Sequence, residues 1–210
     1  MAGSRWIRVL SNACRINRDG LSRLGTLRQA VVVLAGIAIV LLLLAASSTL
    51  KLNLTESMPI GLYLLHRTTM IHVGDIVIAC PPLAAQRVGM ANGYLTRAYG
   101  ITPGSRCVAG SAPVLKYVIA LAGDELVINQ SGLALNGQLF DTRLRARIDS
   151  HGRRLAALIH GRYRLGKYDI WLYSPAPRGW DSRYFGPIKR SDVLGIAKPI
   201  WTPKNVCKFK

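Results

Sequence analysis

Residues 114–128, VLKYVIALAGDELVI, hold two short apolar runs on either side of Gly123 and Asp124. Runs of this length between glycines and polar residues are typical of β-strands. Segments of the same kind occupy residues 61–66, 74–79, 168–173 and 193–197. Residues 133–135 lead into Asn136-Gly137, a pair that favours a tight hairpin. Because no long helical pattern alternates with these strands, the sequence predicts a mainly β domain with antiparallel pairing.

Two stretches interrupt the strand pattern. Residues 81–106 are polar and contain several glycines, and a short helix is predicted at residues 83–90. Residues 143–164 are rich in arginine and predict an exposed excursion. The simplest interpretation of those arginines is a solvated face.

An uncharged apolar run, AVVVLAGIAIVLLLLAASSTL, occupies residues 30–50. About 20 helical residues span roughly 30 Å, the thickness of a bilayer core. A buried core helix is seldom apolar on every face. A cleaved signal peptide is the other alternative, with Ala45-Ala46-Ser47 as a candidate cleavage site, but its apolar region would be shorter. The sequence therefore favours a basic cytoplasmic leader (1–29), one transmembrane helix (30–50) and an exported domain (51–210).

The charges of the leader predict the orientation of this anchor. Six arginines and a single acid precede residue 30. Positive flanks stay in the cytoplasm, so the domain after residue 50 is expected on the far side of the membrane, in the periplasm of a Gram-negative bacterium or outside the cell. Of these two locations we favour the periplasm, with the chain held on a bacterial inner membrane. The whole chain has 28 Lys and Arg against 10 Asp and Glu. For an exported domain this excess favours contact with anionic membrane lipid over binding of nucleic acid.

Four cysteines set limits on cross-links and metals. Cys14 precedes the anchor and is expected to be a free cytoplasmic thiol, while Cys80, Cys107 and Cys207 follow the anchor and leave one thiol over. No CxxC spacing or matching histidine pattern is present, so neither a metal nor another cofactor is expected.

Three segments carry candidate chemistry. Ser57 lies in Glu56-Ser-Met-Pro-Ile-Gly61, where proline and glycine shape a turn before a strand. Taken alone, it can be an ordinary turn serine. Lys116 lies within a predicted strand and either reaches out to solvent or is buried with a lowered pKa, in which case it can act as a base. Asp181 and Arg183 can pair beside a site or form a plain surface ion pair.

Together these segments resemble the type I signal peptidase family. The family has three characteristic sequence boxes, and this chain has a similar segment for each of them in the same order: SMPIG (57–61), LKYVIALAGD (115–124) and DSRYFGPIKRSDVLG (181–195). The resemblance implies a signal-peptidase-like β fold and a serine–lysine dyad in which Ser57 is the nucleophile and Lys116 the base. It also implies an oxyanion hole made by Ser57 and Thr55, and a structural pair of Asp181 and Arg183.

One position departs from the pattern of this family. Housekeeping signal peptidases often carry a serine two residues before the Asp, where it helps to orient the lysine. Here Gly179 occupies that position. Lys116 therefore needs another orienting partner, or the site is tuned differently.

The chain is more similar still to the TraF-type peptidases of conjugative transfer, which carry a cysteine pair around a small insertion. This resemblance implies a Cys80–Cys107 disulfide; two separate thiols, or pairing with Cys207, are the alternatives. It also implies maturation of a precursor protein, a conjugative pilin, by hydrolysis or by cyclisation. Rival functions are a housekeeping signal peptidase, a membrane-tethered pilus assembly module without catalysis, and a self-cleaving repressor of related fold. The anchor and the missing DNA-binding motif disfavour the repressor.

Overall fold

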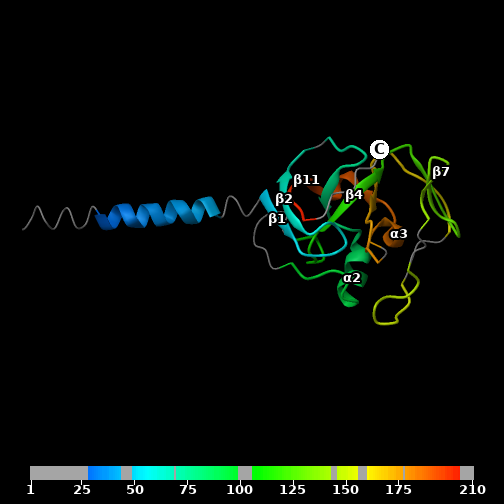
Figure 1. Ribbon diagram of the computed structural model, residues 1–210, viewed down its shortest axis with the longest axis horizontal. Helices are drawn as coiled ribbons and strands as arrows, with labels where there is room; N and C mark the ends of the chain where they lie inside the picture. Colours follow the sequence, from blue (N-terminus) through cyan, green and yellow to red (C-terminus); the bar gives the residue numbers. More distant parts are fainter. Residues whose placement is uncertain are drawn as a thin grey trace, which may run out of the picture. The chain divides into compact units, whose positions relative to one another are not determined.

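The computed structural model describes residues 28–43, 49–68, 70–98, 106–142, 146–155, 160–176 and 178–203 (Figure 1). The chain divides into two compact units, Met1–Ser47 and Ser48–Lys210.

The first unit contains a helix over residues 28–43, all of them exposed. No helix in the described ranges combines the length and the apolar character needed to cross a membrane. The sequence predicts a spanning helix over residues 30–50, of which residues 44–48 lie outside the described residues. The far end of that prediction is wrong, because Leu50 already belongs to the first strand of the next unit.

The second unit is built on a seven-stranded sheet with the order β1-β2-β11-β3-β4-β9-β10. Its strands are β1 (Leu50–Asn53), β2 (Gly61–His66), β3 (Ile76–Ala79), β4 (Val114–Ala120), β9 (Asp169–Tyr173), β10 (Ile188–Lys189) and β11 (Val193–Trp201). Every neighbouring pair is antiparallel. The prediction of a mainly β, antiparallel domain is therefore confirmed.

A second sheet has four antiparallel strands in the order β7-β6-β5-β8. These are β5 (Glu125–Asn129), β6 (Gly132–Leu135), β7 (Gln138–Asp141) and β8 (Gly161–Arg164). In Figure 1 the hairpin ending in β7 lies at the opposite end of this unit from β1 and β2. The predicted turn at Asn136-Gly137 joins β6 to β7, and both of its residues have positive φ (49° and 80°), as a tight hairpin requires.

The sequence analysis missed β1, β7, β8 and β10. The most instructive of these is β8, which ends the arginine-rich excursion and pairs with β5 along its length. Three of its four residues are exposed, so the strand lacks the alternation of apolar and polar residues by which a strand is recognised in a sequence. Of the excursion, residues 143–145 and 156–159 lie outside the described residues.

The main core joins the two sheets. Tyr117 and Trp171 from the large sheet and Leu126 from the small one are fully buried in one cluster. The alternate residues of the central strands, such as Val118 and Leu172, form a second cluster. Residues that alternate along a strand point to opposite faces, so β4 and β9 are buried on both sides. A strand in this position holds its side chains rigidly, and β4 is the strand that carries Lys116.

Close backbone packing explains the glycine at the start of β2. A Cβ on Gly61 would lie 2.2 Å from the carbonyl oxygen of Trp201 in β11. Only glycine allows this approach. The turn before Gly61 is therefore pinned against the C-terminal strand.

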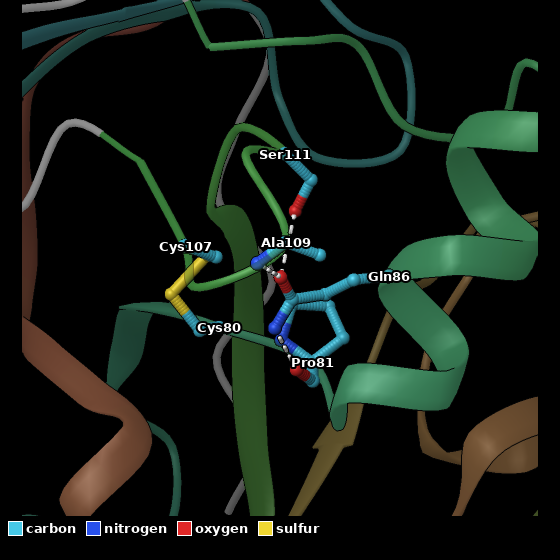
Figure 2. Close-up of a disulfide and its surroundings, with 6 residues drawn as sticks. All are labelled: Cys80, Pro81, Gln86, Cys107, Ala109 and Ser111. Carbon is cyan, nitrogen blue, oxygen red and sulfur yellow. Dashed lines mark hydrogen bonds between the residues drawn. A yellow bond between two sulfur atoms is a disulfide. The ribbon is translucent and has the colours of Figure 1, made fainter.

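A disulfide closes the segment between β3 and β4, as expected from the resemblance. Cys80 and Cys107 are bonded with their Cα atoms 5.6 Å apart (Figure 2). The predicted short helix is present as α2 (Leu83–Ala91). Its buried Gln86 donates to the carbonyl of Pro81 and accepts from the N–H of Ala109, so the side chain clamps both ends of the closed segment. Cys14 and Cys207 lie outside the described residues.

Candidate active site

The turn between β1 and β2 presents Ser57. Asn53, the last residue of β1, is buried, and its side-chain amide donates to the carbonyls of Thr55, Met58 and Pro59 at 3.0–3.1 Å. Met58 is also buried and belongs to the main core. One polar and one apolar anchor therefore hold the turn from beneath, and the Ser57 side chain is left half-buried at its tip.

Lys116 lies in β4 and reaches Ser57. Its Nζ is 2.9 Å from Ser57 Oγ, across 59 residues of sequence. The lysine is only 3% exposed, which rules out the alternative of a side chain extended into solvent. Burial lowers the pKa of Lys116 from 10.5 to about 8; the negative charge of Asp181 opposes this shift and the positive charge of Arg183 adds to it. A lysine with such a pKa has a minor but appreciable neutral fraction near physiological pH, and the neutral amine can accept a proton from serine.

Thr55 is exposed and lies next to the nucleophile. Its Oγ1 is 3.2 Å from Ser57 Oγ, and it donates to the Asn53 side-chain oxygen at 2.7 Å. The threonine hydroxyl is thus oriented by the same asparagine that shapes the turn. It lies beside the serine that would attack a substrate, which is where a donor to a developing oxyanion is needed.

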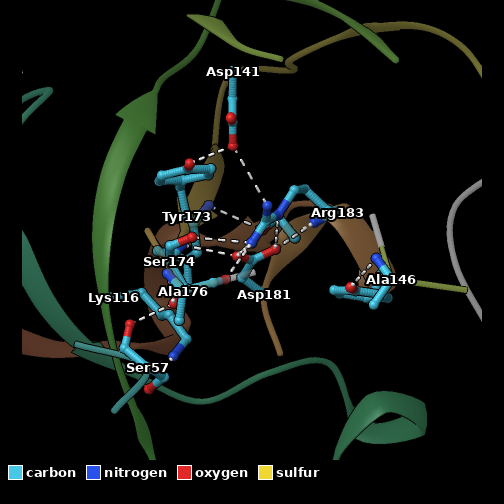
Figure 3. A network of polar contacts seen from close by, with 12 residues as sticks. Ser57, Lys116, Asp141, Ala146, Tyr173, Ser174, Ala176, Asp181 and Arg183 are labelled. Carbon is cyan, nitrogen blue, oxygen red and sulfur yellow. Dashed lines mark hydrogen bonds and ion pairs between the residues drawn. The ribbon is translucent and has the colours of Figure 1, made fainter. Parts of the chain in front are cut away.

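Asp181 and Arg183 form a buried pair close to Lys116 (Figure 3). Arg183 Nη2 lies 2.8 Å from Asp181 Oδ2, and the two side chains are 2% and 0% exposed. Asp181 also caps the short helix α3 (Ser182–Phe185) by accepting from the Arg183 N–H. On its other side Arg183 faces Asp141 of β7 at 3.6 Å, and Asp141 accepts from the hydroxyl of Tyr173 at 2.5 Å. This is a buried network linking the two sheets, not the surface ion pair of the alternative interpretation.

Ser174 connects that network to Ser57. Its hydroxyl donates to the Ser57 carbonyl oxygen, and its backbone N–H donates to Asp181 Oδ2 at 2.8 Å. Gly179, the position that departs from the family pattern, packs against it. A Cβ at Gly179 would lie 2.2 Å from Ser174 Oγ. The space that a side chain at position 179 would need is therefore filled by Ser174.

A cleft of about 500 Å³ opens over the Ser57 and Lys116 side chains. One of its walls is aromatic and apolar, formed by Tyr94, Leu95 and Trp180. Trp180 stacks on Tyr184, and the Tyr94 hydroxyl donates to Asp149 at 2.8 Å. Residues 51–53 and 112–115 also line the cleft. A site with this shape suits an extended chain lying over the serine.

The structure brings together all the candidate residues predicted for the site. Thr55 and Lys116 contact Ser57, and Asp181 with Arg183 lies behind them. The sequence analysis missed Asn53 and Ser174, which hold the serine in place, as well as the aromatic wall. The Asn-x-Thr-x-Ser spacing at the end of β1 was an available signal for Asn53, because asparagine often organises a turn. Ser174 gave no local signal, since its role depends on a contact across 117 residues.

No metal-binding group emerges in the parts of the chain that the structure describes, where His, Cys, Asp and Glu side chains do not gather in threes. The chemistry available at the cleft is that of a hydroxyl, a buried amine and hydrogen-bond donors. Such a set suits attack on a carbonyl group.

Comparison with known proteins agrees with this geometry. The family model described as "Signal peptidase, peptidase S26" matches residues 23–202. A plasmid transfer protein TraF from Escherichia coli is 31% identical over 183 residues, covering 87% of this chain and 99% of its own length. A probable conjugal transfer protein TraF from Sinorhizobium fredii is 35% identical over 155 residues, covering 72% of this chain and 77% of its own. A conjugal transfer protein TraF from Agrobacterium tumefaciens is 31% identical over 180 residues, covering 83% and 97%.

The match covers most of the chain, and it includes the strands, turn and helix that surround Ser57. The resemblance inferred from the three sequence boxes is confirmed at the level of the family and of its TraF-type relatives. This chain belongs to the signal peptidase S26 family of serine peptidases.

Proposed function

We propose that the chain is a membrane-anchored endopeptidase that uses a Ser57–Lys116 dyad to process exported precursor proteins. The observation that carries the proposal is the 2.9 Å contact between Ser57 Oγ and the buried amine of Lys116. In the structure Nζ donates to Oγ. Once the lysine loses its proton the direction of this bond reverses, and the amine becomes the acceptor for the serine proton.

The reaction follows from this arrangement. Ser57 Oγ attacks the scissile carbonyl carbon while its proton passes to Lys116 Nζ, and the carbonyl oxygen becomes an oxyanion. The Ser57 N–H donates a hydrogen bond to that oxygen, and the Thr55 hydroxyl supplies a second one by turning its single proton from the Asn53 side chain to the oxyanion. The Lys116 ammonium then gives its proton to the leaving amine as the peptide bond breaks, and an ester with Ser57 remains. Attack by water, with Lys116 again as the base, releases the acid and restores the serine.

The substrate we propose is a conjugative pilin precursor, because the relatives are named as plasmid and conjugal transfer proteins. An amine can replace water in the second step. If the amine is the amino terminus of the same pilin, the product is a cyclic chain. The proposal includes a location on the periplasmic face of a bacterial inner membrane, supported by the uncharged run over residues 30–50 and the arginines before it. Enzyme and precursor then meet on one membrane surface, which raises their effective concentration.

The test uses the full chain, co-expressed with the candidate pilin, followed by intact mass spectrometry of the pilin. Wild-type chain is expected to remove a segment from the precursor, with a cyclic product one water lighter than the linear one. Ser57→Ala and Lys116→Met are expected to leave the precursor uncut. Lys116→Arg is expected to fail as well, because a guanidinium stays protonated.

Lys189→Met is a matched control, since it removes an exposed lysine whose partner is Asp169 on β9. It is expected to cut like wild type. Precursor cleavage by Ser57→Ala or Lys116→Met would refute the dyad. An uncut pilin combined with cleavage of the cell's other exported precursors would instead point to the housekeeping role.

A further inference from the structure

Ser174 is a fully buried serine whose hydrogen-bonding groups are all engaged around the candidate nucleophile. Its hydroxyl donates to the carbonyl of Ser57 and accepts from the N–H of Ala176 at 3.3 Å. Its own N–H donates to Asp181 at 2.8 Å, and its carbonyl accepts from Arg183 Nη2 at 3.0 Å. Figure 3 shows the serine between the ion pair and Ser57.

We propose that Ser174 is a positioning residue, through which the buried Asp181–Arg183 pair holds the nucleophile in its reactive geometry. The pair acts on Lys116 through charge, and it also bonds both backbone polar groups of Ser174: Asp181 accepts from the Ser174 N–H, and Arg183 donates to the Ser174 carbonyl. Ser174 then passes this constraint to Ser57. The inference rests on the proposed function, because it assigns a role within the same reaction.

The orientation of the Ser57 carbonyl affects the positions of both reactive groups of this residue. A twist of the backbone at Ser57 moves Oγ relative to Lys116 Nζ, and it also redirects the Ser57 N–H that is expected to face the oxyanion. The other anchors of the turn, the Asn53 amide and the Met58 side chain, contact its neighbours and leave this carbonyl to Ser174. A displacement of about 1 Å at a reacting atom can cost on the order of 100-fold in rate.

The glycine at position 179 is a consequence of this arrangement. A Cβ there would lie 2.2 Å from the Oγ and 2.4 Å from the Cβ of Ser174. Ser174 therefore occupies the volume in which a serine at position 179 would place its side chain. The hydroxyl in that volume is supplied from the end of β9, and it is directed at Ser57.

The experiment measures acylation of Ser57 by a fluorescent β-lactam, a class of compound that acylates the catalytic serine of other enzymes that combine serine with lysine. Full-length protein in detergent is titrated with the probe, so that the maximal acylation rate and the half-saturating probe concentration are obtained separately. Ser174→Ala is expected to lower the maximal rate by about 10- to 100-fold. The half-saturating concentration and the pH midpoint of the rate are expected to stay at their wild-type values.

Two further variants separate positioning from stability. Ser174→Cys fills nearly the same volume with a weak donor, so it preserves packing and is expected to slow acylation as Ser174→Ala does. Ser182→Ala is the matched control, because Ser182 is equally buried and bonds a backbone N–H, that of Leu172, at 2.9 Å. It is expected to lower the melting temperature in the same way but to keep the acylation rate close to wild type.

Unchanged maximal rates in both Ser174 variants would overturn the positioning role, and so would a fall in Ser182→Ala as large as that in Ser174→Ala. These outcomes leave the proposed function standing. Acylation of Ser57 that is equally fast when Lys116 is replaced by Met would overturn the proposed dyad, and the proposed function and this inference with it.

Discussion

Titration of Lys116 offers a direct measure of what burial does for this site. Because the amine acts as a base only when neutral, the acylation rate is expected to rise with pH and to level off above a midpoint near 8. At pH 7, a lysine with a pKa of about 8 is about 9% neutral, whereas one at 10.5 is only about 0.03% neutral. Burial in β4 therefore makes the base roughly 300-fold more available at that pH.

The assay is the acylation rate of wild-type protein from pH 6 to 10, at low probe concentration and corrected for spontaneous loss of the probe. Under that condition the midpoint reports the pKa of the free enzyme. Circular dichroism at each pH checks that the fold is intact. A flat profile would refute Lys116 as the base, and a rate that is still climbing tenfold per pH unit at pH 10 would refute the lowered pKa.

The same shift predicts an effect on stability. The folded chain gives up the Lys116 proton near pH 8, and the unfolded chain near 10.5. Between these values the unfolded state binds more protons, so the free energy of unfolding gains with rising pH by an amount on the order of 3 kcal/mol. Below pH 8 the cost of burying the charge is fully present. Lys116→Met is expected to remove this rise and to be more stable than wild type at pH 7, as measured by denaturant unfolding. Lower stability of the variant at pH 7 would contradict the reasoning.

Three other predictions address the neighbours of the dyad. Thr55→Val is expected to reduce the maximal acylation rate by about 10²–10³, the effect of one lost oxyanion donor; an unchanged rate would remove Thr55 from the oxyanion hole. Gly179→Ser is expected to lower the melting temperature sharply, because its Cβ would meet the side chain of Ser174, and Ser174→Gly in the same chain is expected to restore most of the loss. A double variant no more stable than Gly179→Ser would contradict that steric account. Replacing Cys80 and Cys107 together by serine is expected to cost about 3–4 kcal/mol of unfolding free energy in a loop of 27 residues; wild-type stability without the bridge would show that α2 holds the segment unaided.

Much of the fold could be predicted because most strands coincide with a short apolar run in the sequence. The runs at residues 61–66 and 114–121 became β2 and β4 nearly residue for residue. The strands that were missed carry no such pattern. β10 has two residues, and β8 is exposed along most of its length. Their pairing is determined by the neighbouring strand and not by their own composition.

For the candidate site too, the sequence was enough to select residues but not to decide what each of them does. Ser57, Lys116, Asp181 and Arg183 could be selected because each lies in a motif long enough to resemble a family. Each of them also had a plain alternative, such as a turn serine or a lysine extended into solvent, that no local pattern could exclude. The tertiary structure decided between these by bringing Ser57 and Lys116 within 2.9 Å and by leaving only 3% of the lysine exposed.

The sequence by itself determined the mainly β architecture, the apolar segment before it, and the identity of the residues that carry the chemistry. These properties depend on local composition and spacing, which a chain keeps whether or not it is folded. The tertiary structure alone decided how Lys116 is desolvated, how Ser174 connects the Asp181–Arg183 pair to the nucleophile, and why a glycine stands at position 179. Those properties arise from contacts between segments as far as 117 residues apart. Such contacts leave no periodic signal in either partner, since a serine bonded to a distant carbonyl looks the same in sequence as a serine facing water.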